Sequence, residues 1–297
     1  MTAASALPTV AFVGAGRLAN TLAVELSAAH YPVITIASRT HESALRLAAR
    51  IPGCVAATPQ AAADAATLVF ITTSDSAIQA TCDGLRWRAG QRVVHCSGAS
   101  TAAILAKAQR DGATVAAFHP ITTFAGFDDP TPALAGVTFG ADGDTAALAV
   151  LRLMAERLGG RLVLVTPALK ALYHAGGVIA CNYLVTLLAT GERLMTQAGV
   201  EPAVAGDALR LMMRRTLDNT ERLGTAQALS GPVSRGDGPT LERHLAALEA
   251  HAPDLVALYR MLGTATVPVG LAKGTLSPAG ADHVQRILSP HPAPQGD

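Results

Sequence analysis

A short apolar run that ends in a glycine-rich turn limits what this chain can fold into. Residues 9–13 read Thr-Val-Ala-Phe-Val and are followed by Gly14-Ala15-Gly16-Arg17-Leu18-Ala19. The first glycine lets the chain turn sharply, the second leaves room for a pyrophosphate at the backbone, and Ala19 lets the next helix pack closely. That helix points its free N–H groups and its positive dipole end at the phosphates. The pattern therefore predicts a dinucleotide-binding turn rather than an ordinary strand–turn–helix corner.

The end of the second predicted strand indicates which dinucleotide binds. Residues 32–37 form an apolar run that ends in Ser38-Arg39-Thr40, without a carboxylate. NAD-selective folds place a carboxylate at this point, about 20 residues beyond the glycines, where it binds the ribose 2′-hydroxyl. Two hydroxyls and an arginine suit a 2′-phosphate instead, because arginine binds phosphate through two parallel hydrogen bonds. We therefore predict NADP as the cofactor; the alternative is a merely solvated strand end.

Three later strands each end in a cluster of polar residues. The predicted strands 67–71, 91–96 and 114–118 are followed by Thr72-Thr73-Ser74, by Ser97-Gly98 and by His119. In an open α/β sheet, the carboxyl ends of parallel strands line one edge, where ligands bind. One such cluster is usually only a loop, but three in succession along the cofactor edge indicate a site. Residues 136–140 and 161–165 are predicted to form two further strands, which complete a doubly wound parallel α/β sheet. We expect no catalytic or binding residue in this last unit.

The second half of the chain is predicted to be helical. Thr166-Pro167 is a typical helix start, and the helical pattern continues to Gly199. Lys170 and His174 are one turn apart on one face of this helix, and Asn182 lies at the border of that face. We interpret the face as catalytic, with a surface stripe as the alternative. The apolar stretch 171–189 carries polar residues, so we expect a buried core helix rather than a membrane span.

A glycine- and proline-rich segment follows a second amphipathic helix, predicted for residues 202–223. We expect no regular structure in residues 229–240, yet Arg235 and Asp237 stand within them. Arginine is an anion-binding fork, so this segment is either a ligand loop or a simple connector between helices. The tail, residues 289–297, is predicted to be disordered.

Length and composition set wider limits. A chain of 297 residues suggests two domains, which we place at residues 1–165 and 166–288. The net charge of +1 argues against a nucleic-acid binder or a membrane-surface binder. The four cysteines show no metal or redox spacing, and the N-terminus lacks a signal-peptide pattern. We therefore expect no metal site and a cytoplasmic location.

Five short motifs resemble those of one bacterial family. They are the glycine turn at residues 14–19, His95-Cys96-Ser97-Gly98-Ala99, Phe118-His119-Pro120, Tyr173-His174-Ala175 with Asn182-Tyr183, and Gly-Pro-Val-Ser-Arg-Gly-Asp at residues 231–237. The family joins a Rossmann-like domain to a helical C-terminal domain of unknown function, within the 6-phosphogluconate dehydrogenase-like superfamily. The resemblance spans about residues 9 to 262 and implies an NADP-linked oxidoreductase that forms a homodimer through long C-terminal helices.

Some members of this family are ketopantoate reductases. More distant relatives include pyrroline-5-carboxylate reductases, β-hydroxyacid dehydrogenases and deazaflavin-dependent NADP reductases. The β-hydroxyacid dehydrogenases place a lysine and an asparagine four residues apart on their long interdomain helix, and a Ser-Gly pair holds their substrate. Ser97-Gly98 and Lys170 match this arrangement, but His174 stands where the asparagine is expected. The resemblance therefore leaves open which side chain donates the proton.

We expect an NADPH-dependent reductase of a small carboxylate-bearing carbonyl compound, such as a 2-keto acid. A cyclic-imine reductase of the pyrroline-5-carboxylate type is one alternative, and a non-catalytic NADP-binding sensor or scaffold is another. The expected cofactor-binding residues are Gly14, Ala15, Gly16, Arg17, Leu18, Ser38, Arg39, Thr40, Thr72, Thr73 and Ser74. The expected substrate-binding residues are Ser97, Gly98, Asn182, Arg235 and Asp237, and the candidate proton donors are Lys170, His174 and His119.

Overall fold

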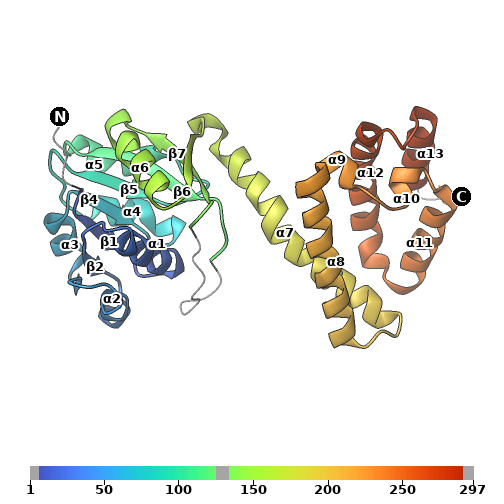
Figure 1. Cartoon of the computed structure of the whole chain (residues 1–297), viewed down its shortest axis with the longest axis horizontal. Helices are drawn as coiled ribbons and strands as arrows, with labels where there is room; N and C mark the ends of the chain where they lie inside the picture. Colours follow the sequence, from blue (N-terminus) through green and yellow to red (C-terminus); the bar gives the residue numbers. More distant parts are fainter. Residues whose placement is uncertain (1–6, 125–133, 290–297) are drawn as a thin grey trace, which may run out of the picture. The chain divides into compact units, whose positions relative to one another are not determined.

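A computed structural model of the chain describes residues 7–124 and 134–289 and divides them between two compact units (Figure 1). The N-terminal unit extends to Asn182, and the C-terminal unit begins at Tyr183. Helix α7 (Lys170–Gln197) therefore begins in the first unit and ends in the second.

The N-terminal unit contains an eight-stranded sheet with the order β3-β2-β1-β4-β5-β6-β7-β8. The first six strands in the chain are parallel to one another. This order confirms the predicted doubly wound α/β fold. The strands are β1 (Val10–Val13), β2 (Val33–Ala37), β3 (Val55–Ala56), β4 (Leu68–Ile71), β5 (Arg92–His95), β6 (Thr114–Pro120), β7 (Thr138–Gly143) and β8 (Arg161–Leu164).

The last two strands differ from the prediction in their direction. Strand β7 runs antiparallel to β6, so that His119 lies opposite Gly140. Strand β8 is parallel to β7 and therefore also runs against the other six. The sequence pattern identified both segments as strands but could not reveal the reversal, because a buried strand reads alike in either direction.

Helices cover both faces of the sheet (Figure 1). Side chains alternate along β1, so Val10 and Phe12 face one layer while Ala11 and Val13 face the other. The first layer consists of α1 (Arg17–Ala28), α2 (His41–Ala48) and α6 (Thr145–Arg157). The second consists of α3 (Pro59–Ala65), α4 (Ile78–Asp83) and α5 (Ala106–Arg110).

Buried phenylalanines form a row across the first face of the sheet. Phe12 stacks on Phe70 with 5.1 Å between ring centroids, and Phe118 stacks on Phe139 at 4.3 Å. A 6.4 Å contact between Phe70 and Phe118 joins the two pairs. Large aromatic side chains dominate the energetics of such cores, so this row fixes the strands whose ends carry the polar clusters.

Helix α7 is not the buried core helix that its apolar sequence led us to expect. Lys170 is the one residue of α7 recorded as buried within the described chain, whereas Leu172, Ile179 and Val185 are 70%, 63% and 67% exposed. By length and composition, residues 167–197 and 253–273 could each cross a membrane. Core helices of soluble proteins meet the same criterion, so this composition is weak evidence for a membrane span.

The C-terminal unit is built from helices. Helix α8 matches the predicted residues 202–223, but the following segment is partly helical rather than irregular. Its short helix α10 stands between Gly231 and Gly236, whose φ angles of 99° and 66° permit sharp turns at both ends. The predicted disordered tail lies outside the described residues from residue 290 onward. The helices are α8 (Pro202–Leu223), α9 (Thr225–Ala228), α10 (Pro232–Arg235), α11 (Gly238–His251), α12 (Val256–Lys273) and α13 (Pro278–Leu288).

Candidate functional site

The predicted glycine turn joins β1 to α1 and is tied to the loop after β4. Gly14 has a φ of 124°, and a Cβ at this position would lie 2.5 Å from the carbonyl of Thr72. The Thr72 hydroxyl donates a hydrogen bond of 2.9 Å to the carbonyl oxygen of Gly14. Only glycine allows this positive φ together with so close an approach of the Thr72 backbone. The glycine turn and the loop after β4 therefore lie against each other.

Helix α1 begins at this turn. Its N-cap is Gly16, no side chain caps it, and its first turn contains no acidic residue. Apart from its own neighbours, no atom of the described residues lies within 4 Å of the position that a Gly16 Cβ would occupy. Unsatisfied N–H groups and a positive dipole end favour an anion. The turn, with Ala15, Arg17 and Leu18 beside it, therefore fits a dinucleotide pyrophosphate.

The predicted 2′-phosphate residues follow β2. Ser38 is half-buried, and Arg39 and Thr40 are exposed. Thr40 is the N-cap residue of α2, and its hydroxyl donates to Ser43 Oγ at 2.7 Å. The Arg39 guanidinium is thus open to solvent at the strand end, as a phosphate-binding side chain requires.

A cavity of about 190 Å³ lies at the carboxyl ends of β4 and β5, beside α1. It brings predicted residues from α1 and from two loops to one place, namely Leu18, Thr72, Thr73 and Ser97. Ser74 lies in the same loop but does not line the cavity. Asp75, which the sequence analysis did not single out, does line it.

The Ser97 hydroxyl is engaged within the protein. It donates to Asp75 Oδ2 at 2.7 Å and accepts the backbone N–H of Ser100 at 3.1 Å. Ser97 is almost completely buried, whereas Asp75 is exposed. These bonds make Ser97 a residue that holds two loops together, and they leave the Asp75 carboxylate as the polar group at the cavity wall. Its position directly after Thr72-Thr73-Ser74 was the available sequence signal.

Two predicted catalytic histidines meet above Gly98. A Cβ on Gly98 would lie 2.8 Å from His119 Nε2 and closer still to the His174 ring. The two rings are 5.8 Å apart, with an interplanar angle of 77°. His119 follows β6 and His174 lies in the second turn of α7, so the chain brings them together from positions 55 residues apart (174 − 119). Because Gly98 has no side chain, both imidazoles can pack directly against its backbone.

Tyr173 completes this group and was missed as a site residue. Its hydroxyl lies 2.8 Å from His119 Nδ1, and the rings form an edge contact at 5.7 Å. The phenol lies over the backbone of Gly140, where a Cβ would be 2.6 Å from Tyr173 Cζ. Its place beside His174, three residues after Lys170, was the signal in the sequence. Together His119, Tyr173 and His174 form the His–Tyr–His cluster.

Burial shifts the protonation of this cluster. Desolvation, with the charges of His174 and Lys170, lowers the pKa of His119 from 6.5 to about 4. Desolvation alone raises the pKa of Tyr173 from 10 to about 12. At neutral pH, His119 is therefore a neutral imidazole and Tyr173 a neutral phenol. Their hydrogen bond joins two uncharged groups that can each hold or release a proton.

Lys170 is paired with a carboxylate in the interior. Its Nζ donates to Asp142 Oδ2, and both side chains are almost fully buried. The other carboxylate oxygen of Asp142 accepts the N–H of Ala102 at 2.7 Å. We expected no chemical residue in residues 136–165, and Asp142 corrects that expectation. It was missed because the reversal of β7, which places it beside Lys170, is invisible in the sequence.

His95 supports the loop beneath Gly98. Its Nδ1 accepts the N–H of Ser97 at 3.1 Å, so Nε2 carries the proton and donates to the carbonyl of Thr101 at 3.0 Å. Burial lowers the pKa of His95. This histidine is thus a neutral structural residue that fixes Ser97 and Gly98.

The remaining predicted substrate-binding residues are found on α7 and in the C-terminal unit. Asn182 is an exposed residue of α7. In the C-terminal unit, Asp237 Oδ1 accepts the N–H of Thr240 at 3.2 Å and thereby caps α11. Arg235 is 62% exposed, and its NH2 group lies 3.9 Å from Asp237 Oδ2. Local contacts therefore account for Arg235 and Asp237, and substrate binding by these two residues stays a prediction.

Comparisons with known proteins agree with this architecture. A family model described as a Rossmann-like domain matches residues 3–120, and one described as a domain of unknown function, DUF2520, matches residues 137–266. No curated protein sequence matches the chain.

Solved structures share the fold over most of the chain. Protein TM1727 from Thermotoga maritima is 26% identical with a TM-score of 0.71, over 90% of this chain and 100% of that one. BF3122 from Bacteroides fragilis, assigned as an NADP oxidoreductase, is 23% identical with a TM-score of 0.69, over 88% and 98%. A reductive aminase from Aspergillus terreus, in complex with NADPH and ethyl levulinate, is 16% identical with a TM-score of 0.61, over 95% and 99%. The chain therefore contains a match to a Rossmann-like domain followed by a match to DUF2520.

Proposed function

We propose that this protein is an NADPH-dependent oxidoreductase that reduces a small carboxylate-bearing carbonyl compound, such as a 2-keto acid of the ketopantoate type. The observation that carries the proposal is the meeting of His119, Tyr173 and His174 above Gly98, next to the cavity at the cofactor edge of the sheet. When bound along the glycine turn, NADPH supplies the hydride. Arg39, at the end of β2, favours the 2′-phosphate of this cofactor.

The His119–Tyr173 pair supplies the proton that the new alkoxide needs. With the proton on Nδ1, His119 donates to the phenol oxygen, and the Tyr173 O–H is free to donate to the substrate. With the proton on Nε2, Tyr173 donates to Nδ1, and the N–H of His119 faces the space above Gly98. Either tautomer presents one acidic proton.

The other predicted residues take supporting roles in this proposal. Lys170 positions α7 through Asp142, and His174 offers a ring nitrogen for the developing oxyanion. Asn182, Arg235 and Asp237 remain proposed contacts for the substrate carboxylate.

A panel of substrates tests the proposal. Purified full-length protein is mixed with NADPH and with 2-keto acids, including ketopantoate, and the cofactor absorbance is followed. We expect turnover with a keto acid, and about a tenfold or greater loss of kcat/KM for NADPH, but not for NADH, in Arg39→Ala. Arg110→Ala, which removes an exposed arginine from α5, is the control. Tight NADPH binding without turnover of any compound would instead indicate a sensor.

Reduction of a cyclic imine is the second candidate function. The fold shared with a reductive aminase favours it, because reductive amination reduces a C=N bond. An iminium arrives already protonated, so a neutral His119 would suffice beside it. Cyclic imines, including pyrroline-5-carboxylate, therefore belong in the same panel, and turnover of imines alone would select this function.

We also propose that the protein works as a cytoplasmic homodimer through its long helices. Helix α7 exposes apolar side chains such as Leu172 and Ile179. Their exposure supports the proposal, because a second copy of the chain would cover them. Light scattering coupled to size-exclusion chromatography measures the mass. A monomer at micromolar concentration would contradict this assembly.

A further inference from the structure

A second cavity lies at the opposite edge of the sheet from the glycine turn. It has a volume of about 860 Å³ and lies beside the amino-terminal ends of β1, β4 and β5, between these strands and α6. Its lining includes Thr9 just before β1, Thr67 just before β4 and Arg92 at the start of β5. Arg157 lines it from α6. The four-residue strand β1 separates the two edges by about 13 Å. This cavity is therefore distinct from the proposed reaction site.

Arg92 lines the cavity and also contains an unpaired buried atom. Its Nε is buried, and within residues 7–124 and 134–289 it meets no hydrogen-bond acceptor. No carboxylate of the described chain forms an ion pair with its guanidinium. An orphaned buried donor costs stability unless something binds it. The Arg92 side chain therefore lines the cavity without an acidic partner in the described chain.

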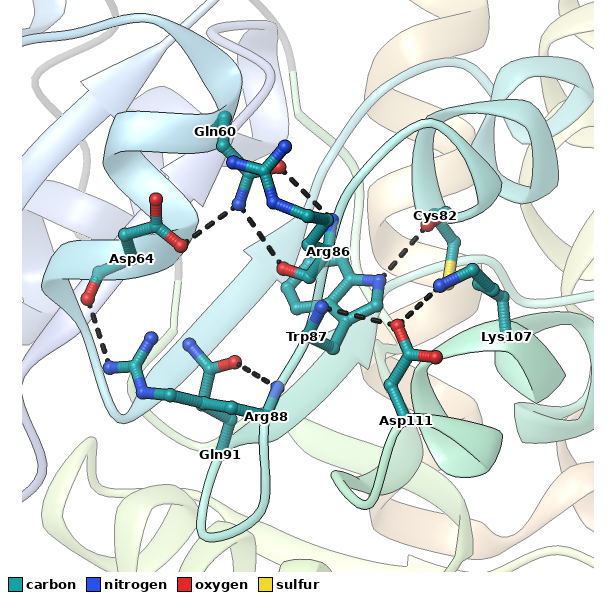
Figure 2. Close-up of polar contacts among 9 residues, drawn as sticks. All are labelled: Gln60, Asp64, Cys82, Arg86, Trp87, Arg88, Gln91, Lys107 and Asp111. Atoms are coloured by element: carbon teal, nitrogen blue, oxygen red, sulfur yellow. Dashed lines mark hydrogen bonds and ion pairs between the residues drawn. The ribbon is translucent and has the colours of Figure 1, made fainter.

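The loop before Arg92 is held firmly (Figure 2). Gln91 donates to the carbonyls of Ala63 and Ala66 at 2.6 and 3.1 Å, and its Oε1 accepts the N–H of Arg88 at 3.0 Å. The Arg88 guanidinium donates to the carbonyl of Asp64 at 2.9 Å. These bonds fix the backbone of the loop from which Arg92 extends.

Arg157 provides a second guanidinium without an acidic partner in the described chain. Its Cζ lies 5.5 Å from the centroid of the Tyr31 ring, which also lines the cavity. Glu156 is the one carboxylate in the lining, and it forms no ion pair with either arginine. Two arginines against one glutamate leave the wall with an excess positive charge.

Part of the remaining wall is apolar. Leu7 and Val150 line the cavity together with the Tyr31 ring, and a volume of this size is typical of small-molecule sites. Residues 1–6, which precede Leu7, contain no aspartate or glutamate, so that segment carries no side-chain anion for the arginines. We propose that this cavity binds a small organic anion, with Arg92 and Arg157 holding its phosphate or carboxylate and Tyr31 packing against its apolar body.

Tyrosine NMR tests this binding directly. Full-length protein with ring-labelled tyrosine is saturated with NADPH, so that the glycine turn is occupied, and is titrated with phenyl phosphate. Tyr31→Phe assigns the Tyr31 signal among the four tyrosines. We expect this signal to shift on binding, and the affinity to fall about tenfold or more in Arg92→Gln and in Arg157→Gln. Arg152→Gln, an exposed arginine of the same helix α6 outside the cavity, is the matched control.

Several outcomes would overturn the proposal. An unmoved Tyr31 signal, or equal affinity in all three arginine variants, would exclude an anion site here. If Arg92→Gln fails to fold, the exposed Arg157 still decides the question alone. Inorganic phosphate is titrated as a second probe, and equal affinity for the two probes would exclude a role for the apolar wall.

Discussion

Lys170 and Asp142 form an ion pair inside the N-terminal unit, where 1% and 4% of their side chains are exposed. The pair fastens the first residue of α7 to β7. Removing one partner from a buried pair leaves a charge without compensation, which typically costs about 3–5 kcal/mol.

We therefore expect Asp142→Asn to lower the free energy of unfolding by roughly 3 kcal/mol in urea titrations. Combining it with Lys170→Met should recover part of this loss, because no unpaired ammonium is then buried. Asp254→Asn is the control. It breaks an exposed ion pair in which a guanidinium nitrogen of Arg193 lies 2.6 Å from Asp254 Oδ2. We expect this variant to change the free energy of unfolding little. Equal losses in the two single variants would contradict this account.

Tyr173→Phe tests the proposed proton donor. The variant keeps the ring but loses the hydrogen bond to His119, and we expect kcat to fall about 10²-fold or more, with a smaller change in KM. Tyr259→Phe is a closely matched control. It removes the 2.7 Å hydrogen bond between the Tyr259 hydroxyl and His244 Nδ1 in the C-terminal unit. Similar kcat losses in both variants would assign Tyr173 a structural role only.

The low pKa of His119 predicts a pH dependence of stability. In the unfolded chain a histidine takes up its proton near pH 6.5, whereas in the folded protein His119 does so at about 4. Between these values the unfolded state binds more protons, so stability falls as the pH is lowered from about 6.5 to about 4.

His119→Gln should flatten this decline, measured as the free energy of unfolding against pH. A residual slope is expected from His95, whose pKa burial also lowers. An unchanged slope in His119→Gln would show that His119 is not held neutral by the fold.

Gly98→Ala tests the close packing above the loop after β5. Its Cβ would lie 2.8 Å from His119 Nε2, so the imidazole must move, and we expect a loss of activity greater than the loss of stability. Gly176→Ala is the control, because nothing lies within 4 Å of its Cβ position. In a helix this change should stabilise by about 0.5–1 kcal/mol. Full activity of Gly98→Ala would show that the two histidines are not confined by this backbone.

Local patterns explain which parts of the fold could be predicted. The glycine turn, the buried strands and helix α8 each carry their signal within a few neighbouring residues, and the structure contains them as expected. Helix α10 was missed because a proline in its first turn and glycines at both ends read equally well as an irregular loop. The domain boundary after residue 165 stays a prediction.

Long-range pairing explains what the sequence concealed at the site. Nothing in the sequence around Asp142 indicates that it meets Lys170, 28 residues later (170 − 142). Likewise, the Ser97 motif indicated a ligand contact but not the hydrogen bond that the Ser97 hydroxyl donates to Asp75. Motifs show which residue types gather at a strand end, but hydrogen-bond partners depend on the assembled fold.

The reversal of β7 has a consequence for how such a site can change. The dinucleotide edge is assembled from loops that follow parallel strands, whereas Tyr173 and His174 arrive on the first turns of a helix that is fastened through β7. His119, after the parallel strand β6, is where the two halves of the site touch. Under the proposed function, substitutions in the first turns of α7 would alter the proton-donating side chains and leave the glycine turn unchanged, so reductases of different substrates could share one nucleotide-binding half.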